Sequence, residues 1–303
     1  AERVLCVGIG GGGDVAGALA AAGAAEALGT PAELGGLTWE RRPIDPLPGP
    51  RTLDEVTGAV RLHPAAALAG PDTTGPGGFH FAESRMAAVL GRPVALIDPG
   101  AGPATIAAGL LAVAEHLDCD LLVLLDVGGD VLAHGDEPGL ASPLADALLL
   151  AAAPHTAAAG LRTIGVVFGA GCDGELTPAE VRERADEIAA GGGDLGETDP
   201  PPAALDRLEG ALATVPTEAS AMALRCARGE TGRATIRGGR RTVELTALGG
   251  RLLWFEPDAA IAGPARLAAA VADAGSLRAA HDTLTARGIR TELAYELDAA
   301  AER

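Results

Sequence analysis

The sequence predicts an α/β protein with a doubly wound, mainly parallel, Rossmann-like sheet and a smaller C-terminal α+β portion. Two observations indicate this fold class. Short apolar runs alternate with helix-like stretches through the first two thirds of the 303 residues. The runs are apolar at nearly every position, which is typical of strands covered on both faces of a parallel sheet. Because ligands bind beyond the carboxyl ends of such strands, the loops that follow them are the first places to search for a site.

The first expected strand, Val4–Gly8, is followed by glycines and by an Ala-rich helix over residues 14–28. Further strands are expected over residues 33–38, 93–97, 120–125 and 162–168, and helices over residues 81–90, 103–116, 142–153 and 177–190. The last of these helices has a clear start. Thr177 is a capping residue, Pro178 suits the first turn, and Glu180 is the acid three positions after the cap.

Residues 191–202 are rich in Gly, Pro and acids, and we interpret them as a linker loop between a ligand-binding core and a C-terminal portion. The core is residues 1–190 and the C-terminal portion is residues 203–303. Helices in that portion are expected over residues 203–213, 217–228, 264–275 and 277–287, and strands over residues 233–237, 242–248 and 251–255. Gly238 and Gly239 indicate a hairpin between the first two strands. The portion is either a separate subdomain or an extension of the main sheet.

The composition excludes several kinds of chemistry. The chain has no Lys, Asn or Gln, so all 23 residues counted as Lys or Arg are Arg. Schiff-base enzymes, phosphate-binding loops with a lysine, and Tyr-x-x-x-Lys dehydrogenases are therefore excluded. A strong mutational bias in the source genome accounts for these absences. Any function must use acids, Arg, His, Ser, Thr, Cys, backbone groups or a bound cofactor.

The net charge of −18 argues against nucleic acids and anionic membrane surfaces as partners, because both attract cationic proteins. We therefore expect a small-molecule ligand, and a homo-oligomer is compatible with the sequence. The four Cys have no C-x-x-C spacing, and no signal peptide is visible at the N-terminus. Reduced thiols and a cytoplasmic location are expected from these features.

A glycine-rich turn follows the first strand. Its G-x-G-x-x-G pattern, between a strand and a helix, suits a phosphate, a nucleotide or a carboxylate. Asp14 follows at once, where it would repel a bare phosphate unless a metal ion lay between them. The alternative is that Asp14 only caps the helix. The candidate cofactor-binding residues of this turn are Gly10, Gly11, Gly12 and Gly13.

The second and third strands are also followed by candidate binding residues. Trp39, Glu40 and Arg41 open a Pro-rich loop and are candidates for lining the substrate. The alternative is a surface crossover whose charges pair with each other. Asp98 precedes a glycine-rich turn into a helix, which is a recurrent ligand position, and a capping role explains it equally well.

The densest group of acids follows the fourth strand. Gly128 and Gly129, which are further candidate cofactor-binding residues, lie between two aspartates and let their carboxylates turn toward one point. Clustered carboxylates bind Mg²⁺-like cations, hold a cationic group or share a proton. Asp146 lies one turn past the N-cap candidate Ser142, and we expect it to contact substrate. The alternative is a solvated acidic loop. The candidate catalytic residues are Asp126, Asp130, Asp136 and Glu137.

Two more acids, Asp173 and Glu175, follow the fifth strand, and Glu175 is a further candidate for substrate binding. Cys172 is a potential nucleophile, but its acidic neighbours would raise its pKa and favour a bystander thiol. No His/Cys spacing fits a zinc site. Mg²⁺ or a similar divalent cation, and a nucleotide, are the cofactors compatible with these loops. The candidate metal ligands are Asp14, Asp126, Asp130 and Asp173.

Taken in order, these motifs resemble a prokaryotic family called domain of unknown function 1152. The resemblance rests on the Gly-Gly-Gly-Asp opening, the Trp39-Glu40-Arg41 turn, the loops of residues 126–130 and 135–137, Ser142-Pro143, and the loop of residues 171–175. It runs along most of the chain and is most distinctive before residue 176. It implies no reaction and no substrate.

The leading hypothesis is an enzyme of small-molecule metabolism, a hydrolase, lyase or transferase that uses a metal ion or acid–base groups at the strand ends. One alternative is a non-catalytic nucleotide or metabolite sensor. Another is an NAD- or FAD-dependent oxidoreductase with its dinucleotide on residues 8–13. Without Lys, a phosphate on the glycine turn must be neutralised by N–H groups, by Arg or by a metal, unless the ligand is itself cationic.

Overall fold

The computed structural model describes residues 1–302 and confirms the α/β class. Five parallel strands form the centre of its nine-stranded sheet, in the spatial order β5, β2, β1, β6, β7. Numbered by their order in the chain, these five strands run 3-2-1-4-5, which is the Rossmann order of a doubly wound sheet. They are β1 (Val4–Gly8), β2 (Ala32–Leu37), β5 (Val94–Ile97), β6 (Leu121–Val127) and β7 (Arg162–Phe168).

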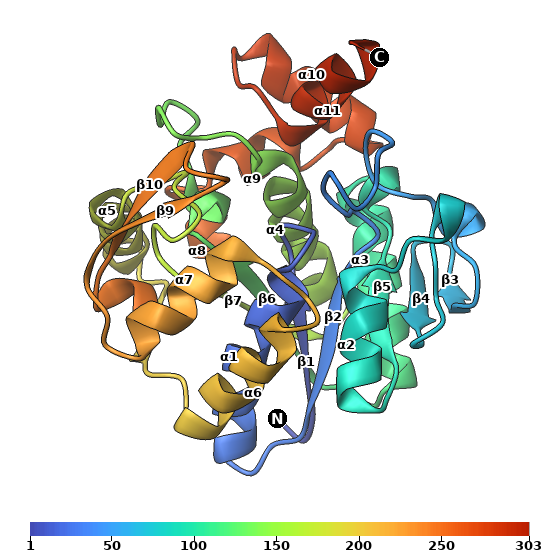
Figure 1. The fold of residues 1–303 in the computed structure, drawn as a ribbon, viewed down its shortest axis with the longest axis horizontal. Coiled ribbons are helices and arrows are strands. Elements are labelled where there is room, and N and C mark those ends of the chain that lie inside the picture. The colour runs from blue at the N-terminus through green and yellow to red at the C-terminus, as the bar shows by residue number, and fades with distance from the viewer. Residues whose placement is uncertain (303) are drawn as a thin grey trace.

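Helices cover both faces of this sheet (Figure 1). Alternate residues of β1 show why its whole run is apolar: Val4 and Cys6 belong to one core, and Leu5 and Val7 to the other. The first core includes α1 (Asp14–Ala27), α2 (Ala82–Leu90), α6 (Pro202–Leu212) and α7 (Glu218–Ala227). The second includes α3 (Pro103–His116), α4 (Pro143–Ala158), α5 (Pro178–Ala190), α8 (Pro257–Ala262) and α9 (Arg266–Val271).

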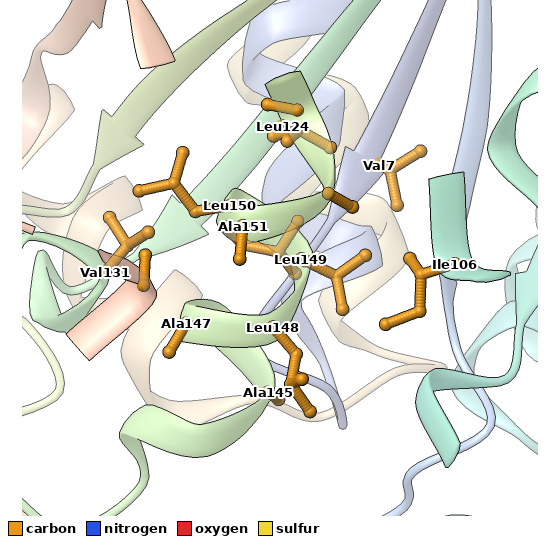
Figure 2. Close-up of a cluster of buried hydrophobic side chains, with 14 of the residues drawn as sticks. Val7, Ile106, Leu124, Val131, Ala145, Ala147, Leu148, Leu149, Leu150 and Ala151 are labelled. Carbon is orange, nitrogen blue, oxygen red and sulfur yellow. The ribbon is translucent and has the colours of Figure 1, made fainter. Parts of the chain in front are cut away.

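Helix α4 is buried along most of its length. Residues 143–153 are all buried, and the helix packs against α3, α8, α9 and β7. Figure 2 shows Leu148 and Leu149 in one apolar cluster with Val7 of β1 and Ile106 of α3. A helix that is apolar all round is stable only when other elements cover every side. Asp146, in the first turn of α4, is therefore carried into the interior of the protein.

Antiparallel strands extend both edges of the sheet. On one side β4 (Ala66–Ala69) pairs with β5, and β3 (Val60–His63) is the outermost strand. On the other side β11 (Leu252–Phe255) pairs with β7, and β8 (Asp194–Thr198) is the outermost strand. The sequence pattern does not predict β3 and β4, because both are short and Ala, which dominates β4, has low strand propensity. β8 lies within the loop expected over residues 191–202. Pairing with β11 overrides the loop-like composition there.

Beyond residue 202 the chain contributes to the main sheet and also forms a separate hairpin. β11 corresponds to the strand expected over residues 251–255. β9 (Gly232–Ile236) and β10 (Arg241–Leu245) pair with each other around Gly238 and Gly239, as the sequence predicts. The chain closes with α10 (Leu277–Ala286) and α11 (Glu292–Ala301). Across residues 1–302, every helix is too short or too polar to cross a membrane.

Candidate functional site

The carboxyl ends of β1 and β6 are neighbours at the point where the strand order reverses. The chain leaves β1 for α1 on one face of the sheet and leaves β6 for α4 on the opposite face. Two connections that diverge in this way leave a crevice between the strand ends, which is where ligands bind in doubly wound sheets. The acids that follow β1 and β6 therefore lie where this fold places ligands.

Asp14, Asp126 and Asp146 form the first group of acids at this point, called here the central trio. One carboxylate oxygen from each lies within 4.8 Å of those of the other two. Asp14 is the first residue of α1, Asp126 lies near the end of β6, and Asp146 lies in the first turn of α4. Three elements that are distant in the sequence thus bring their carboxylates to one place.

Backbone N–H groups hold two of these carboxylates. Oδ2 of Asp14 accepts a hydrogen bond from the N–H of Gly10 at 3.0 Å, and Oδ2 of Asp126 accepts one from Gly129 at 2.8 Å. Oδ1 of Asp146 is buried and has no hydrogen-bond partner in the described part of the chain. A buried carboxylate oxygen without a partner is costly, so this atom indicates a missing ligand or a bound proton.

Burial and mutual repulsion oppose ionisation of the central trio. Burial, partly offset by the N–H of Gly10, raises the pKa of Asp14 from 3.8 to about 7. Burial, followed by the charges of neighbouring aspartates, raises the pKa values of Asp126 and Asp146 well above 3.8. The ion pairs found in residues 1–302 include none of the three. The central trio therefore lacks a directly paired counter-charge.

Asp130, Asp173 and Glu175 form a second trio, and their oxygens also lie within 4.8 Å of one another. Asp130 begins a short helix after β6, and the other two lie in the loop after β7. Burial, then the charges of Asp146 and Glu175, raises the pKa of Asp130 well above 3.8. Burial, then Glu175, raises that of Asp173 to about 8. Because Asp130 is also repelled by Asp146, the two trios form one acidic site.

Gly128 allows the loops after β6 and β7 to approach closely. Its φ is +144°, and a Cβ at this position would lie 2.4 Å from Cγ of Asp173. The N–H of Gly171 donates to the carbonyl oxygen of Gly128 at 2.8 Å, which ties the two loops together. Only glycine fits this backbone at this distance.

The glycine turn after β1 is contacted closely by the loop after β2. The N–H of Gly12 donates to the carbonyl oxygen of Trp39 at 2.8 Å. Nη2 of Arg41 donates to the carbonyl oxygen of Gly10 at 2.6 Å. The Arg41 guanidinium also lies over the Trp39 ring, 4.6 Å from its centroid. Asp14 faces this turn and does not cap α1, whose cap position is Gly13. The capping alternative for Asp14 is therefore wrong.

Helix α11 supplies two acids that no local pattern could identify. Glu292 accepts hydrogen bonds from the N–H groups of Leu144 and Ala145 at 3.0 and 2.9 Å, so it covers the N-terminus of α4. Glu296 accepts from Nε1 of Trp39 at 3.1 Å. Both acids lie within 3.6 Å of the Arg41 guanidinium. The C-terminal helix therefore holds Trp39 and Arg41 beside the site.

Comparison with known proteins identifies a family without a reaction. The family model described as "Protein of unknown function (DUF1152)" matches residues 5–300. The chain belongs to this family. No curated protein and no solved structure is significantly similar to it. The DUF1152 match spans both trios and helix α11, and it confirms the resemblance that the motifs predict.

In this DUF1152 protein Glu137 lies outside both trios and supports a loop. Its carboxylate accepts hydrogen bonds from the N–H groups of His134 and Gly135 at 2.7 and 2.8 Å, and it pairs with Arg184 at 3.2 Å. The neighbouring Asp136 is exposed. The structure thus separates these two predicted catalytic residues from Asp126 and Asp130.

Asp98 and Glu40 also lie outside the trios and hold backbone turns. Asp98 accepts from the N–H groups of Gly100 and Leu53, at 2.8 and 3.3 Å, and so begins the turn after β5. Glu40 accepts from the N–H of Ala82 at the start of α2, and burial raises its pKa to about 7. Asp98 therefore takes the capping role that was its alternative, whereas the buried Glu40 does not belong to a surface crossover with paired charges.

Proposed function

We propose that this DUF1152 protein is an enzyme of small-molecule metabolism that holds a divalent cation, such as Mg²⁺, on Asp14, Asp126 and Asp146. The observation that carries the proposal is the unpartnered, buried Oδ1 of Asp146 within a group of three carboxylates. Such a group is stable when it is protonated or when it binds a cation. Carboxylate oxygens are the ligands that Mg²⁺, Mn²⁺ and Ca²⁺ prefer.

The burial of the carboxylates favours a metal ion over an organic cation. The three residues are at most 9 % exposed, which suits a small ion better than an ammonium or guanidinium group with its attached carbon atoms. When bound, a divalent cation polarises an oxygen of the substrate and supports hydrolytic, lyase or group-transfer chemistry. The second trio lies beside this position and supplies carboxylates for proton transfer.

Arginines around the acids support a substrate with an anionic group. Arg41 and Arg237 both lower the pKa of Asp14, and Arg237 and Arg241 lower that of Asp173, so all three lie near enough for their charge to act on the site. Arg237 and Arg241 lie on either side of the β9–β10 turn. A phosphate or carboxylate held between the cation and these guanidinium groups satisfies both charges.

The dinucleotide hypothesis has less support from the glycine turn. The N–H groups of Gly10 and Gly12 already donate to Asp14 and Trp39. A pyrophosphate on this turn would have to displace both acceptors and lie against the Asp14 carboxylate. A hydride-transfer function therefore ranks below metal-assisted chemistry.

Thermal stability in the presence of ligands tests the cation site. Wild type, Asp146→Asn and the control Asp136→Asn are compared with MgCl₂, MnCl₂, CaCl₂, NAD, FAD and ATP. Divalent cations should raise the Tm of wild type and of the control, and should raise that of Asp146→Asn much less. Equal stabilisation of all three proteins by cations, or stabilisation of wild type by NAD or FAD alone, would show the proposal to be wrong.

Turnover separates an enzyme from a sensor. Any small molecule that stabilises the cation-loaded protein is incubated with it, and the mixture is analysed by mass spectrometry. A product that forms with wild type and not with Asp146→Asn supports the enzyme. A ligand that binds wild type and is recovered unchanged supports the non-catalytic sensor instead.

A further inference from the structure

Two of the four cysteines meet in the folded protein although they are 54 positions apart. Cys172 lies in the loop after β7, and Cys226 lies near the end of α7. Their Sγ atoms are 3.8 Å apart, and both residues are buried free thiols. The packing of α7 against the sheet therefore creates a thiol pair that the cysteine spacing does not indicate.

The surroundings of the pair hold the sulfurs together and leave space beside one of them. A Cβ on Gly249 would lie 2.9 Å from Sγ of Cys226 and 3.1 Å from Sγ of Cys172, so the glycine backbone packs on both. Cys226 lines a cavity of about 220 Å³, together with Asp199, Thr231 and others, and Cys172 is not among the lining residues. That volume admits molecules of the size of hydrogen peroxide, because a water molecule occupies about 30 Å³.

We propose that Cys226 and Cys172 form a redox-active pair, in which hydrogen peroxide or another small hydroperoxide oxidises Cys226 and Cys172 then closes a reversible disulfide. The proposal goes beyond the cation-dependent function, and neither depends on the other.

The two steps balance without a further reactant. The thiolate of Cys226 attacks one oxygen of hydrogen peroxide and the O–O bond breaks, which gives a sulfenic acid and hydroxide, and the hydroxide takes up the proton that the Cys226 thiol released and becomes water. The sulfur of Cys172 then attacks the sulfur of Cys226, its thiol proton leaves with the hydroxyl group as a second water, and the S–S bond forms. Two thiols are oxidised and one peroxide is reduced. A low-molecular-weight thiol reverses the change by exchange.

The cavity and the contact between the sulfurs set the order of attack. Cys226 lines the cavity and Cys172 does not, so a peroxide reaches Cys226 first. The hydrogen bond from Cys172 also lowers the pKa of Cys226 to about 7. The pKa of Cys119 is instead raised by burial, to about 11. Cys119 is nevertheless the more exposed of the two residues, at 8 % against 3 % for Cys226. Exposure alone would favour oxidation of Cys119. The paired geometry favours Cys226, since the thiolate is the reactive form.

Closing the disulfide also affects the acidic site. The sulfurs must approach from 3.8 Å to about 2.05 Å, a change that side-chain rotation and movement of the loop after β7 or of α7 have to supply between them. Asp173 of the second trio directly follows Cys172, and Gly171 is hydrogen bonded to Gly128 in the loop after β6. Oxidation should therefore shift the carboxylate of Asp173 relative to Asp126.

The test exposes reduced wild-type protein to hydrogen peroxide at neutral pH and follows it by intact mass and by peptide mapping after alkylation. The protein should lose two hydrogen atoms, a Cys172–Cys226 linked peptide should appear, and dithiothreitol should restore both thiols. The pair should react at least roughly tenfold faster than Cys119. Amide hydrogen exchange in residues 169–176 should change on oxidation. Unchanged exchange there would refute the link to the acidic site.

Serine variants identify which sulfur reacts first. In Cys172→Ser, Cys226 should be oxidised to the sulfinic state without a cross-link, and in Cys226→Ser, Cys172 should stay reduced for the same time. The control Cys119→Ser should form the disulfide at the wild-type rate. Oxidation of Cys119 ahead of the pair in wild type, or an unchanged rate at Cys172 in Cys226→Ser, would overturn the proposal, and the wild-type result does not depend on the variants folding.

Discussion

Asp126, near the end of β6, and Glu137, in the connection that follows it, are both buried, but the pKa of Asp126 is raised and that of Glu137 is lowered. Asp126 lies near the end of β6 among other acids, and burial and the charges of Asp14 and Asp173 raise its pKa well above 3.8. Glu137 lies further along the same connection. Burial opposes its ionisation too, but the N–H groups of His134 and Gly135 and the charge of Arg184 outweigh this effect and lower its pKa.

The difference shows that burial of an acid does not identify a functional residue. Both carboxylate oxygens of Glu137 accept hydrogen bonds from the protein, two of them from the backbone of its own loop. The six carboxylate oxygens of the central trio accept only three backbone hydrogen bonds in the described part of the chain, and Asp146 retains a buried oxygen without a partner. Acids whose needs the fold leaves unmet are the ones available to a ligand. Four substitutions or conditions probe this contrast.

The largest effect is expected from Glu137→Ala. The substitution removes one partner of Arg184, which keeps its ion pair with Glu187, and it leaves two partly buried backbone N–H groups without an acceptor, so the free energy of unfolding should fall by about 3–5 kcal/mol. Urea unfolding measures the change. The fraction of the variant that remains folded should bind cations as wild type does. A decrease in the free energy of unfolding of about 1 kcal/mol or less would show that Glu137 is not structural.

Asp146→Asn should act in the opposite direction. Asn cannot carry the charge that the other two aspartates repel, so in the absence of cations the free energy of unfolding at pH 8 should rise by about 1–3 kcal/mol. Added Mn²⁺ should then stabilise the variant less than it stabilises wild type. Destabilisation like that of Glu137→Ala would place Asp146 among the structural acids.

The cation-free protein should lose stability as the pH rises. Asp14 and Asp173 have pKa values raised from 3.8 to about 7 and about 8, so between pH 4 and 8 the folded protein retains protons that the unfolded chain releases. The free energy of unfolding should therefore fall across this range, by roughly 1 kcal/mol per pH unit for each retained proton. Saturating Mn²⁺ should flatten the dependence. Constant stability from pH 5 to pH 8 would contradict the raised pKa values.

The smallest effect is expected from Asp136→Ala. This acid is exposed and directly precedes Glu137, so it differs from its neighbour mainly in burial. Its removal should change the free energy of unfolding by less than about 0.5 kcal/mol and leave cation binding unchanged. A marked loss of cation binding would show that Asp136 contributes to the cation site, as Asp14, Asp126 and Asp146 are proposed to do.

Much of the fold follows from local pattern. The five parallel strands are apolar at most of their positions, and loops rich in Gly or Pro follow them, so residue order alone predicts their existence. β4 and β8 escape prediction because their residues have weak strand propensity and become strands through pairing with β5 and β11. The hairpin at Gly238 and Gly239 is predicted because its turn chemistry is local.

The site was predictable in composition and less so in arrangement. Asp14, Asp126, Asp130 and Asp173, proposed as one set of metal ligands, are divided between two trios. Asp146 completes the first and Glu175 the second. Which acids meet in each trio depends on how α4 and the loop after β7 pack against the rest of the protein. The spacing of these residues along the chain does not reveal that packing.

The sequence therefore determines the class of fold, the edge of the sheet where a ligand would bind, and the residue types available there, because periodicity and turn chemistry act over a few residues. Packing decides the rest. It pairs Glu137 with Arg184, leaves Oδ1 of Asp146 without a hydrogen-bond partner in the described residues, and brings Glu292 and Arg41 together. It also places Cys172 against Cys226. Contacts between distant segments depend on the whole buried interior, so only the folded chain specifies them.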